Sequence, residues 1–116
     1  MMRFSFSRLA LCALCGASIT LMPSLASAGW VLQSSGTSNG LWSVHFPVDA
    51  STGYAVGYWG TILKTTDGGT TWVRQFSGTS NPLYFVNFPL DSQTGYAVGS
   101  GGTILKTTDG GASGVE

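Results

Sequence analysis

The sequence predicts an all-β fold, and three observations carry this prediction. Residues 30–71 and 72–113 are two gapless copies of one unit of 42 residues, identical at 29 positions. Short β-prone runs recur in each copy between turn residues, and no stretch after position 28 has a helical period with caps. A repeat length in the low forties with strand signals is typical of a propeller blade. We therefore predict two four-stranded, propeller-type blades, which make an incomplete propeller.

The first expected strand of each unit alternates in polarity. The run Leu41–Phe46 places three apolar side chains on one face, those of Trp42, Val44 and Phe46. The second copy repeats this apolar face with Tyr84, Val86 and Phe88. Such alternation indicates a strand with one face toward a core. We therefore expect Trp42 and Tyr84 to be core residues.

Three further strands are expected in the first unit, at Tyr54–Val56, Thr61–Lys64 and Trp72–Phe76. Turns rich in Asp, Gly and Pro connect the strands of both copies. Trp30–Gln33 matches Trp72–Gln75, so the chain is expected to begin with an outer strand and to lack one in its last blade. Two blades cannot close a ring, and their edges stay unpaired. Three or four copies associating into a ring of six or eight blades would let Trp30–Gln33 clasp the neighbouring chain.

The first 28 residues have the pattern of a secretory signal peptide. Arg3 and Arg8 precede or flank an uncharged, mostly apolar run, Leu9–Met22, and Ala26-Ser27-Ala28 offers the small residues that signal peptidase reads. The apolar run is too short to span about 30 Å of hydrocarbon as a helix. We predict cleavage near Ala28 and a periplasmic or extracellular location for residues 29–116, without a stable membrane span.

The composition after position 28 excludes several classes of function. Three basic and five acidic residues give a net charge of −2, and so few basic residues cannot form the phosphate-facing patch of a nucleic-acid binder. Cysteine is absent there, so packing rather than disulfides must hold the fold. His45 is the single histidine, and the four aspartates form no D-x-D-x-D loop. We predict no metal site and no cofactor, and we expect His45 to be solvated or hydrogen-bonded.

One turn carries a specific motif. Thr65-Thr66-Asp67-Gly68-Gly69-Thr70-Thr71-Trp72 matches Ser/Thr-x-Asp-x-Gly-x-Thr-Trp at every fixed position. We expect Asp67 to accept hydrogen bonds from turn N–H groups, Gly69 to take a positive φ, and Trp72 to bury its ring beside the turn. The second copy has Gly114 where the Trp belongs. A structural role is predicted for Thr65, Asp67, Gly69, Thr71, Trp72, Asp109 and Gly111.

This motif looks like the Asp box of bacterial-neuraminidase-type (BNR) repeats. With the preceding Gly-Tyr-Ala-Val-Gly and Gly-Thr-Ile-Leu-Lys segments, it makes nearly all of residues 29–116 resemble the photosystem II assembly/stability factor family and its non-photosynthetic bacterial relatives. The resemblance implies a seven-bladed, exported propeller that acts in assembly or protein binding without enzymatic activity. Arg74 is the one arginine after position 28, so the arginine patch of the family has no counterpart here.

A sialidase-like hydrolase would share the Asp boxes but would need an arginine cluster, a tyrosine nucleophile and an acidic partner. One arginine is available, and each aspartate has an equivalent in the other repeat, which fits a role in the fold. No catalytic residue is therefore predicted. Two hypotheses stay open. The chain is an exported, non-enzymatic module for protein binding or assembly, or it is a truncated fragment of a longer BNR-repeat protein with a ligand- or glycan-binding role, which the DNA downstream of Glu116 would reveal.

The two copies differ most informatively in one turn. Tyr58-Trp59 in the first copy is replaced by Ser100-Gly101 in the second. Two adjacent aromatic residues are unfavourable in water, and loops between strands often carry partner contacts. Two interpretations stay open, a partner or glycan contact and a contact with a neighbouring blade. We take Tyr58 and Trp59 as the candidate partner-binding residues.

Overall fold

The computed structural model describes residues 29–113. It divides into two units, the first ending at Leu32 and the second beginning at Gln33, and all strands lie in the second unit. The first unit is described only over residues 29–32, which form neither helix nor strand. The predicted signal peptide, residues 1–28, lies outside the described residues. Within residues 29–113, no helix has the length and apolar character that crossing a membrane requires.

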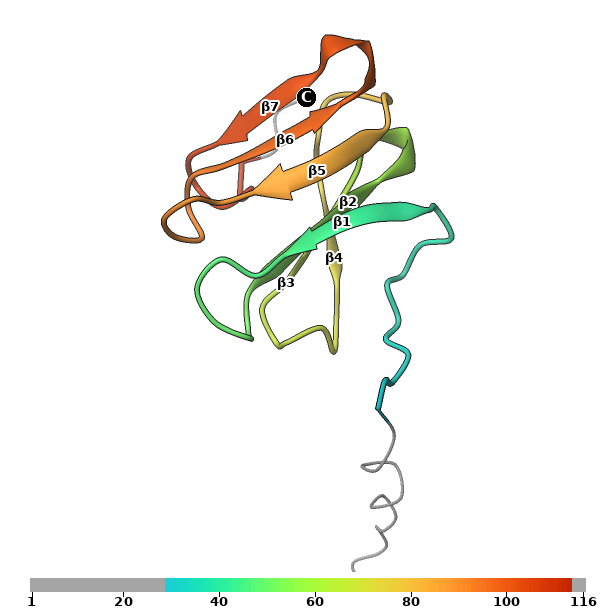
Figure 1. Cartoon of the computed structure of the whole chain (residues 1–116), viewed down its shortest axis with the longest axis vertical. Coiled ribbons are helices and arrows are strands. Elements are labelled where there is room, and N and C mark those ends of the chain that lie inside the picture. Colours follow the sequence, from blue (N-terminus) through green and yellow to red (C-terminus); the bar gives the residue numbers. More distant parts are fainter. Residues whose placement is uncertain (1–28, 114–116) are drawn as a thin grey trace, which may run out of the picture. The chain divides into compact units, whose positions relative to one another are not determined.

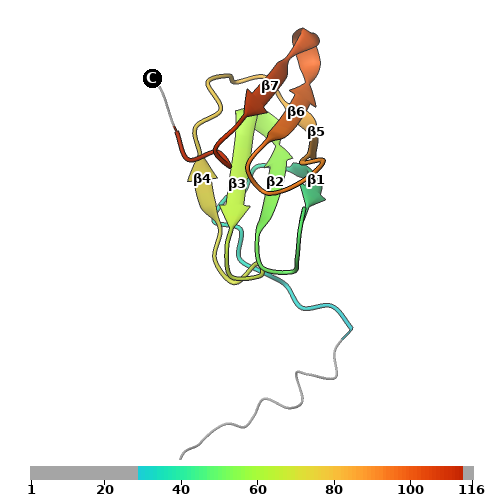
Figure 2. The same cartoon turned by 90° about the vertical axis from the view of Figure 1, so that its left-hand side faces the viewer.

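The first sheet consists of four antiparallel strands that lie side by side in chain order (Figures 1 and 2). Its strands are β1 (Leu41–His45), β2 (Gly53–Gly57), β3 (Thr61–Thr65) and β4 (Val73–Gln75). A 3-10 turn, η2 (Tyr58–Gly60), joins β2 to β3. The four strands predicted from the sequence are confirmed, each to within one residue at either end.

The second sheet repeats the first three strands of this pattern. It contains β5 (Leu83–Asn87), β6 (Gly95–Gly99) and β7 (Ile104–Thr107), with the 3-10 turn η3 (Ser100–Gly102) between β6 and β7. Both sheets pair in the same register, including a bulge near the start of β1 and of β5. No strand follows β7 as far as residue 113, so the outer edge of β7 has no strand partner. The all-β fold class is confirmed.

The two glycines of each Gly-Tyr-Ala-Val-Gly strand are required by close approaches. A Cβ on Gly53 would lie 2.5 Å from the ring of Phe46, and one on Gly57 would lie 2.0 Å from the carbonyl oxygen of Gly40. The equivalent positions of the second sheet are equally tight. Because no side chain fits at these distances, glycine at both ends of the strand lets the loop before β1 and the aromatic ring after it pack against the backbone.

One apolar core joins the two sheets face to face. It consists of six buried residues, two from the first sheet and four from the segment that forms the second: Tyr54, Val56, Leu83, Val86, Phe88 and Ala97. Partly buried Ile62 and Leu105 pack against them. The rings of Tyr54 and Phe88 stack with centroids 4.1 Å apart and planes 17° apart. Neither sheet buries these side chains by itself, so each depends on the other for its core.

Polar contacts fix the second sheet in place on the first. The single proton of the Tyr54 hydroxyl is shared between the carbonyl oxygens of Ser92 (3.0 Å) and Gly110 (3.1 Å), and Nζ of Lys64 donates to the same Gly110 carbonyl (3.1 Å). Burial, and secondarily the charge of Asp109, raises the pKa of the Tyr54 hydroxyl, which keeps it protonated as a donor. These contacts are directional and therefore set how the two sheets align.

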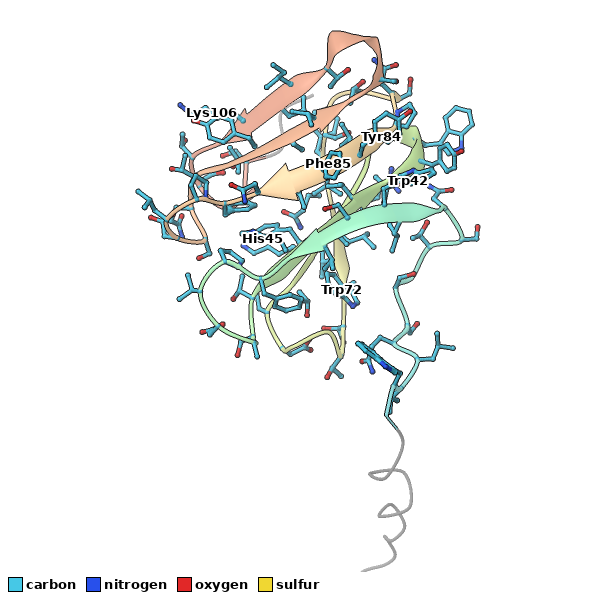
Figure 3. The ribbon with its side chains drawn as sticks, viewed as in Figure 1. Trp42, His45, Trp72, Tyr84, Phe85 and Lys106 are labelled. Atoms are coloured by element: carbon cyan, nitrogen blue, oxygen red, sulfur yellow. The ribbon has the colours of Figure 1, made fainter. Side chains whose placement is uncertain are left out.

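His45 supplies a further contact between the sheets. Its Nδ1 accepts a hydrogen bond from the backbone N–H of Phe88 at 3.2 Å. His45 lies in β1 (Figure 3) and is paired across the strands with Tyr54, so both side chains are on the same face of the sheet. The histidine is hydrogen-bonded, one of the two roles expected of it.

The prediction that Trp42 and Tyr84 are core residues is wrong. Both side chains are exposed, as is Val44 on the same strand as Trp42. Trp42 is exposed because the apolar face of β1 is turned away from the second sheet. Tyr84 is exposed because the bulge between Leu83 and Phe85 interrupts the alternation that buries Leu83 and Val86. The pattern of Trp42 and Val44 is that of a covered face, and the described residues supply no second sheet to cover it.

The expected outer strand at Trp30–Gln33 is not formed in the described structure. Its repeat equivalents, Val73–Gln75, pair with β3 of the unit that precedes them. The edge that corresponds to β3 would lie in a unit before Trp30–Gln33, and residues 29–113 contain none. The idea that this segment clasps another chain stays a prediction.

Candidate partner-binding site

The turn that carries Tyr58 and Trp59 is held by a small hydrogen-bond network. The N–H of Tyr58 donates to the carbonyl oxygen of Gly40 at 3.0 Å, which ties the turn to the loop before β1. Thr61, fully buried, donates from its hydroxyl to the Tyr58 carbonyl (2.6 Å) and accepts from Nδ2 of Asn39 (3.0 Å). Because both ends of the turn are fixed in this way, its aromatic side chains project from a rigid support.

Trp59 has a strained backbone. Its φ of 58° and ψ of 33° lie in the left-handed region, and it is the one non-glycine residue with a positive φ among residues 29–113. The equivalent Gly101 in the second sheet has nearly the same conformation, with φ 66° and ψ 24°. A left-handed conformation costs a non-glycine residue about 1–2 kcal/mol. The indole for which this strain is accepted is 66% exposed and is not part of the apolar core of the described structure.

Tyr58 is part of a larger aromatic group, and Trp59 lies next to it in the turn. Tyr58 packs edge-on against Trp42 with ring centroids 5.4 Å apart, and Trp42 packs edge-on against Tyr84 at 5.7 Å. Trp42 and Tyr84 lie together at one end of the two sheets, far from Lys106 (Figure 3). We call Trp42, Tyr58, Trp59 and Tyr84 the aromatic cluster. All four side chains are exposed. The rings of Tyr58, Trp42 and Tyr84 are in contact across both sheets, and Trp59 follows Tyr58 in the same turn.

The sequence predicts Tyr58 and Trp59 as partner-binding residues, but it does not identify Trp42 and Tyr84 as surface residues. The alternation of Trp42 and Tyr84 with Val44 and Val86 predicts core positions for both. A signal for their place was available in the strand pairing, because Leu41 pairs with Gly57 and so brings Trp42 beside the turn that follows. The strain at Trp59 could also have been inferred, since its repeat equivalent is a glycine in a turn.

The Asp-box turn lies at the other end of β3 and is a separate structure. The Asp67 carboxylate accepts from the N–H (2.9 Å) and hydroxyl (2.7 Å) of Thr71 and from the hydroxyl of Thr65 (2.8 Å). These hydrogen bonds, those of Thr71 first, lower the pKa of Asp67 to about 2. Gly69 has a φ of 98°, and the half-buried ring of Trp72 lies beside it and packs edge-on against Phe46 at 6.3 Å.

The second Asp-box turn has the same hydrogen-bond arrangement, but Gly114 stands in its sequence where the first turn has Trp72. The carboxylate of Asp109 accepts from the hydroxyl of Thr107 at 2.9 Å and from the hydroxyl and N–H of Ser113. The hydrogen bonds of Ser113 and Thr107 lower the pKa of Asp109. Gly111, with a φ of 82°, donates from its N–H to the Thr107 hydroxyl at 2.8 Å. Every polar group of both carboxylates is thus engaged with its own turn, which is a structural use of the acid.

The chemistry that these features offer is recognition. In residues 29–113, the structure brings together no group of three or more His, Cys, Asp or Glu side chains that could hold a metal ion. The aromatic cluster presents flat apolar faces, the Tyr58 and Tyr84 hydroxyls and an indole on a fixed support. Such groups are typical of sites that contact a partner's side chains, since they combine large contact area with few rotatable bonds.

Comparison with known proteins identifies the family. Residues 22–115 match the model of a family described as photosynthesis system II assembly factor YCF48. The chain belongs to the YCF48 family. No curated protein matches the sequence. Membership explains why two BNR-type repeats make up almost all of the described residues.

Two solved structures of YCF48 resemble the chain. One, described as YCF48 bound to D1 peptide, is 30% identical, with a TM-score of 0.59 over 68% of this chain. The other, YCF48 from Cyanidioschyzon merolae, is 28% identical, with a TM-score of 0.57 over 66% of this chain. The matched region spans only 26% of either solved chain. The two sheets therefore correspond to part of a propeller, which confirms the prediction of an incomplete propeller built from blades.

Proposed function

We propose that the chain is an exported, non-enzymatic module that binds a protein partner during the assembly of a larger complex, with photosystem II as the assembly that the family indicates. The aromatic cluster is the proposed contact surface. Trp59 is the observation that carries this proposal. A tryptophan occupies a strained position that the sister repeat fills with glycine, and its ring is left exposed.

A peptide segment is the partner class that best fits this surface. One YCF48 relative of similar structure is described as bound to D1 peptide, so a peptide ligand is compatible with this propeller family. The aromatic cluster is apolar and lies on a fixed turn, which suits an extended segment with apolar side chains. The affinity of such a contact depends on a few buried aromatic anchors, here Trp59 and Tyr58, more than on total area.

The deciding experiment converts the turn of the first repeat into that of the second. The double substitution Tyr58→Ser and Trp59→Gly reproduces Ser100-Gly101, which keeps the same backbone conformation in η3. Binding of a synthetic D1 peptide is measured by isothermal titration calorimetry for the parent chain and for this variant. We expect the variant to remain folded and its dissociation constant to rise at least about tenfold, as for the loss of an aromatic anchor.

The matched control is Leu90→Ser, which removes an exposed apolar side chain from a loop outside the aromatic cluster. We expect this variant to bind the peptide as the parent chain does. Equal binding by the parent chain and the double variant would refute the aromatic cluster as the contact surface. Absence of binding by the folded parent chain would refute the D1 peptide as its ligand.

A glycan is the second candidate ligand. In this alternative the chain is a fragment of a longer BNR-repeat protein that binds glycans. The exposed indole of Trp59 favours it, because a flat aromatic face can stack on the apolar face of a sugar ring while hydroxyl groups nearby form hydrogen bonds. A glycan array probed with the parent chain and with the double variant separates the two ligands. Binding to glycans that depends on Tyr58 and Trp59, without binding to the peptide, would favour this alternative.

Export is part of the proposal and has its own test. The arginines, apolar run and Ala26-Ser27-Ala28 of the first 28 residues support it. Mass spectrometry of the protein recovered from cells that express the full gene should find a chain that begins at Gly29 in the periplasm or medium. A chain that retains residues 1–28 and stays in the cytoplasm would contradict export.

A further inference from the structure

The contact between the two sheets is made by two sets of side chains. The first sheet contributes one face of β2 and β3, with Tyr54, Val56, Ile62 and Lys64. The second sheet contributes the opposite face of its own strands and the ring that follows β5, with Leu83, Val86, Phe88, Ala97 and Leu105. The first set supplies the hydroxyl and ammonium donors, and the Asp-box turn that follows β7 supplies the Gly110 carbonyl that accepts from them.

Both sets occur a second time in the chain, residue for residue. The equivalents of the first set are Tyr96, Val98, Ile104 and Lys106, which form the open face of the second sheet. The equivalents of the second set are Leu41, Val44, Phe46, Ala55 and Leu63, which form the outer face of the first sheet. All nine side chains are identical between equivalent positions. The chain therefore carries both halves of its own internal contact on opposite outer surfaces.

Exposure shows that the open face is uncovered and that the outer face is exposed at Leu41 and Val44, while Ala55 and Leu63 on it are buried. Tyr54 is 1% exposed and its equivalent Tyr96 is 40% exposed, while Val86 is 9% exposed and its equivalent Val44 is 58% exposed. Ile104 is also exposed, whereas its equivalent Ile62 is partly buried against the core. Lys106 lies over the ring of Tyr96, as Lys64 lies over that of Tyr54, so the donors of the open face are already arranged as in the formed contact.

The acceptors are arranged as well. In the formed contact, Tyr54 and Lys64 donate to the carbonyl of Gly110 in the second Asp-box turn. The first Asp-box turn presents Gly68 in the same conformation, with a φ of 72° against 68° for Gly110. Both turns are held by the same hydrogen bonds from threonine to aspartate. A second molecule could thus offer its Gly68 carbonyl to Tyr96 and Lys106.

We propose that the open face of the second sheet binds the outer face of the first sheet in a second copy of this chain, in a head-to-tail arrangement. The contact reproduces the internal one, with Tyr96 stacked on the partner's Phe46 and Ile104 packed on its apolar face. It is heterologous, because each copy uses a different surface, and it can therefore continue from chain to chain. This inference does not depend on the peptide ligand proposed above.

Two residues of the open face differ from the template, and both are compatible with it. Asn87 stands where His45 accepts the N–H of Phe88, and its side-chain oxygen can accept the equivalent N–H of Phe46. Phe85 (Figure 3) stands where the first sheet has Ser43. It is paired with Val98, so its exposed ring adds apolar area to the same face. The exchange makes the open face more apolar than the face that is buried inside the chain.

The free edge of β7 belongs to the same contact. In the first sheet, β3 pairs with β4 through Ile62 and Gln75, Leu63 and Arg74, and Lys64 and Val73. The repeat equivalents of Val73–Gln75 are residues 31–33, which the copy that supplies the outer face carries ahead of its β1. In the proposed assembly this segment exchanges its present contacts for pairing with β7, which gives the second sheet a fourth strand and covers its edge.

The test uses two charge substitutions, one on each face. Sedimentation velocity of the full chain as expressed, over a range of concentrations, should show association that grows with concentration. Ile104→Asp places a carboxylate in the open face, and Val44→Asp places one in the outer face. Each should raise the dissociation constant at least about tenfold, because a carboxylate without a partner is unfavourable in an apolar contact. Leu90→Asp, in an exposed loop outside both faces, should leave association unchanged.

Mixing the two variants identifies the arrangement. Ile104→Asp retains an intact outer face and Val44→Asp an intact open face, so an equal mixture should form a one-to-one dimer that grows no further. Circular dichroism checks that both variants are folded, which their exposed positions favour. A parent chain that is monomeric at every concentration would overturn the proposal, because the two faces would then not bind each other. A mixture that stays monomeric while the parent chain associates would overturn the head-to-tail arrangement.

Discussion

Trp59 shows how one residue can be placed against the local preference of the backbone. Its left-handed conformation is that of Gly101 in the sister repeat, so the turn would form more readily with glycine. We expect Trp59→Gly to be more stable than Trp59→Ala by about 1 kcal/mol, because alanine keeps the strain while glycine removes it at some cost in chain entropy. Urea unfolding of the two variants measures the difference. Equal stability would contradict the assignment of strain to this position.

Asp67 makes the stability of the fold depend on acid. Its pKa of about 2 in the folded chain is below the ordinary value of 3.8, so the ionised carboxylate stabilises the folded state. This contribution is complete above about pH 4 and is lost as the pH falls toward 2. We expect the free energy of unfolding of Asp67→Asn to vary less between pH 4 and pH 2 than that of the parent chain. Urea unfolding at several pH values measures this difference.

The cause of the low pKa of Asp67 can be tested at Thr71. Its N–H and hydroxyl both donate to the carboxylate, and Val keeps the first donor while it removes the second. We expect Thr71→Val to raise the midpoint of the Asp67 carboxyl titration, followed by carbon-13 chemical shift. Thr70→Val is the matched control, because Thr70 is exposed and makes no hydrogen bond to Asp67 in the structure. A midpoint that does not move in Thr71→Val would assign the low pKa to the remaining donors, the Thr71 N–H and the Thr65 hydroxyl.

At the scale of the strand, β2 and β6 have the same sequence, but the tyrosine and valine of β2 are buried and those of β6 are exposed. The hydroxyl proton of Tyr54 is shared by two carbonyls across the contact between the sheets, whereas no residue within 29–113 accepts from the exposed Tyr96 hydroxyl. We expect Tyr54→Phe to lower the free energy of unfolding by about 1–2 kcal/mol, because buried carbonyls lose a donor. Tyr96→Phe should change it by less than about 0.5 kcal/mol in dilute solution. Equal effects in the two variants would contradict the described packing.

The same pair of strands shows what the sequence could and could not predict. Glycine and turn residues mark the ends of every strand, so all seven strands of the described structure follow from local patterns. Alternation predicts that a face will be covered, but not whether its cover is present. Val44 and Val86 share one pattern, and only Val86 meets another sheet. The hydrogen bond from the Phe88 N–H to His45 was beyond prediction, because it depends on how residues 43 positions apart in the sequence meet across two sheets.

For the whole molecule, the arrangement of the sheets determines how the fold unfolds. The apolar cluster takes Tyr54 and Val56 from the first sheet and its other buried members from the second, so the free energy of folding comes largely from their contact. The carbonyl of Gly110 and the N–H of Phe88 are likewise satisfied by the first sheet. Separation of the sheets would expose these groups together. The two sheets should therefore form one cooperative unit.

This cooperativity leads to a prediction with an internal control. Val86→Ala removes two methyl groups from the shared core and should lower the free energy of unfolding by about 2 kcal/mol. The signals of Trp72 in the first part of the chain and Tyr96 in the second, followed by nuclear magnetic resonance in urea, should be lost at one common and lower midpoint. Val44→Ala, at the equivalent exposed position, should leave that midpoint almost unchanged in dilute solution. Separate midpoints for Trp72 and Tyr96 would mean that each sheet folds alone, in contradiction to a core that neither sheet can bury by itself.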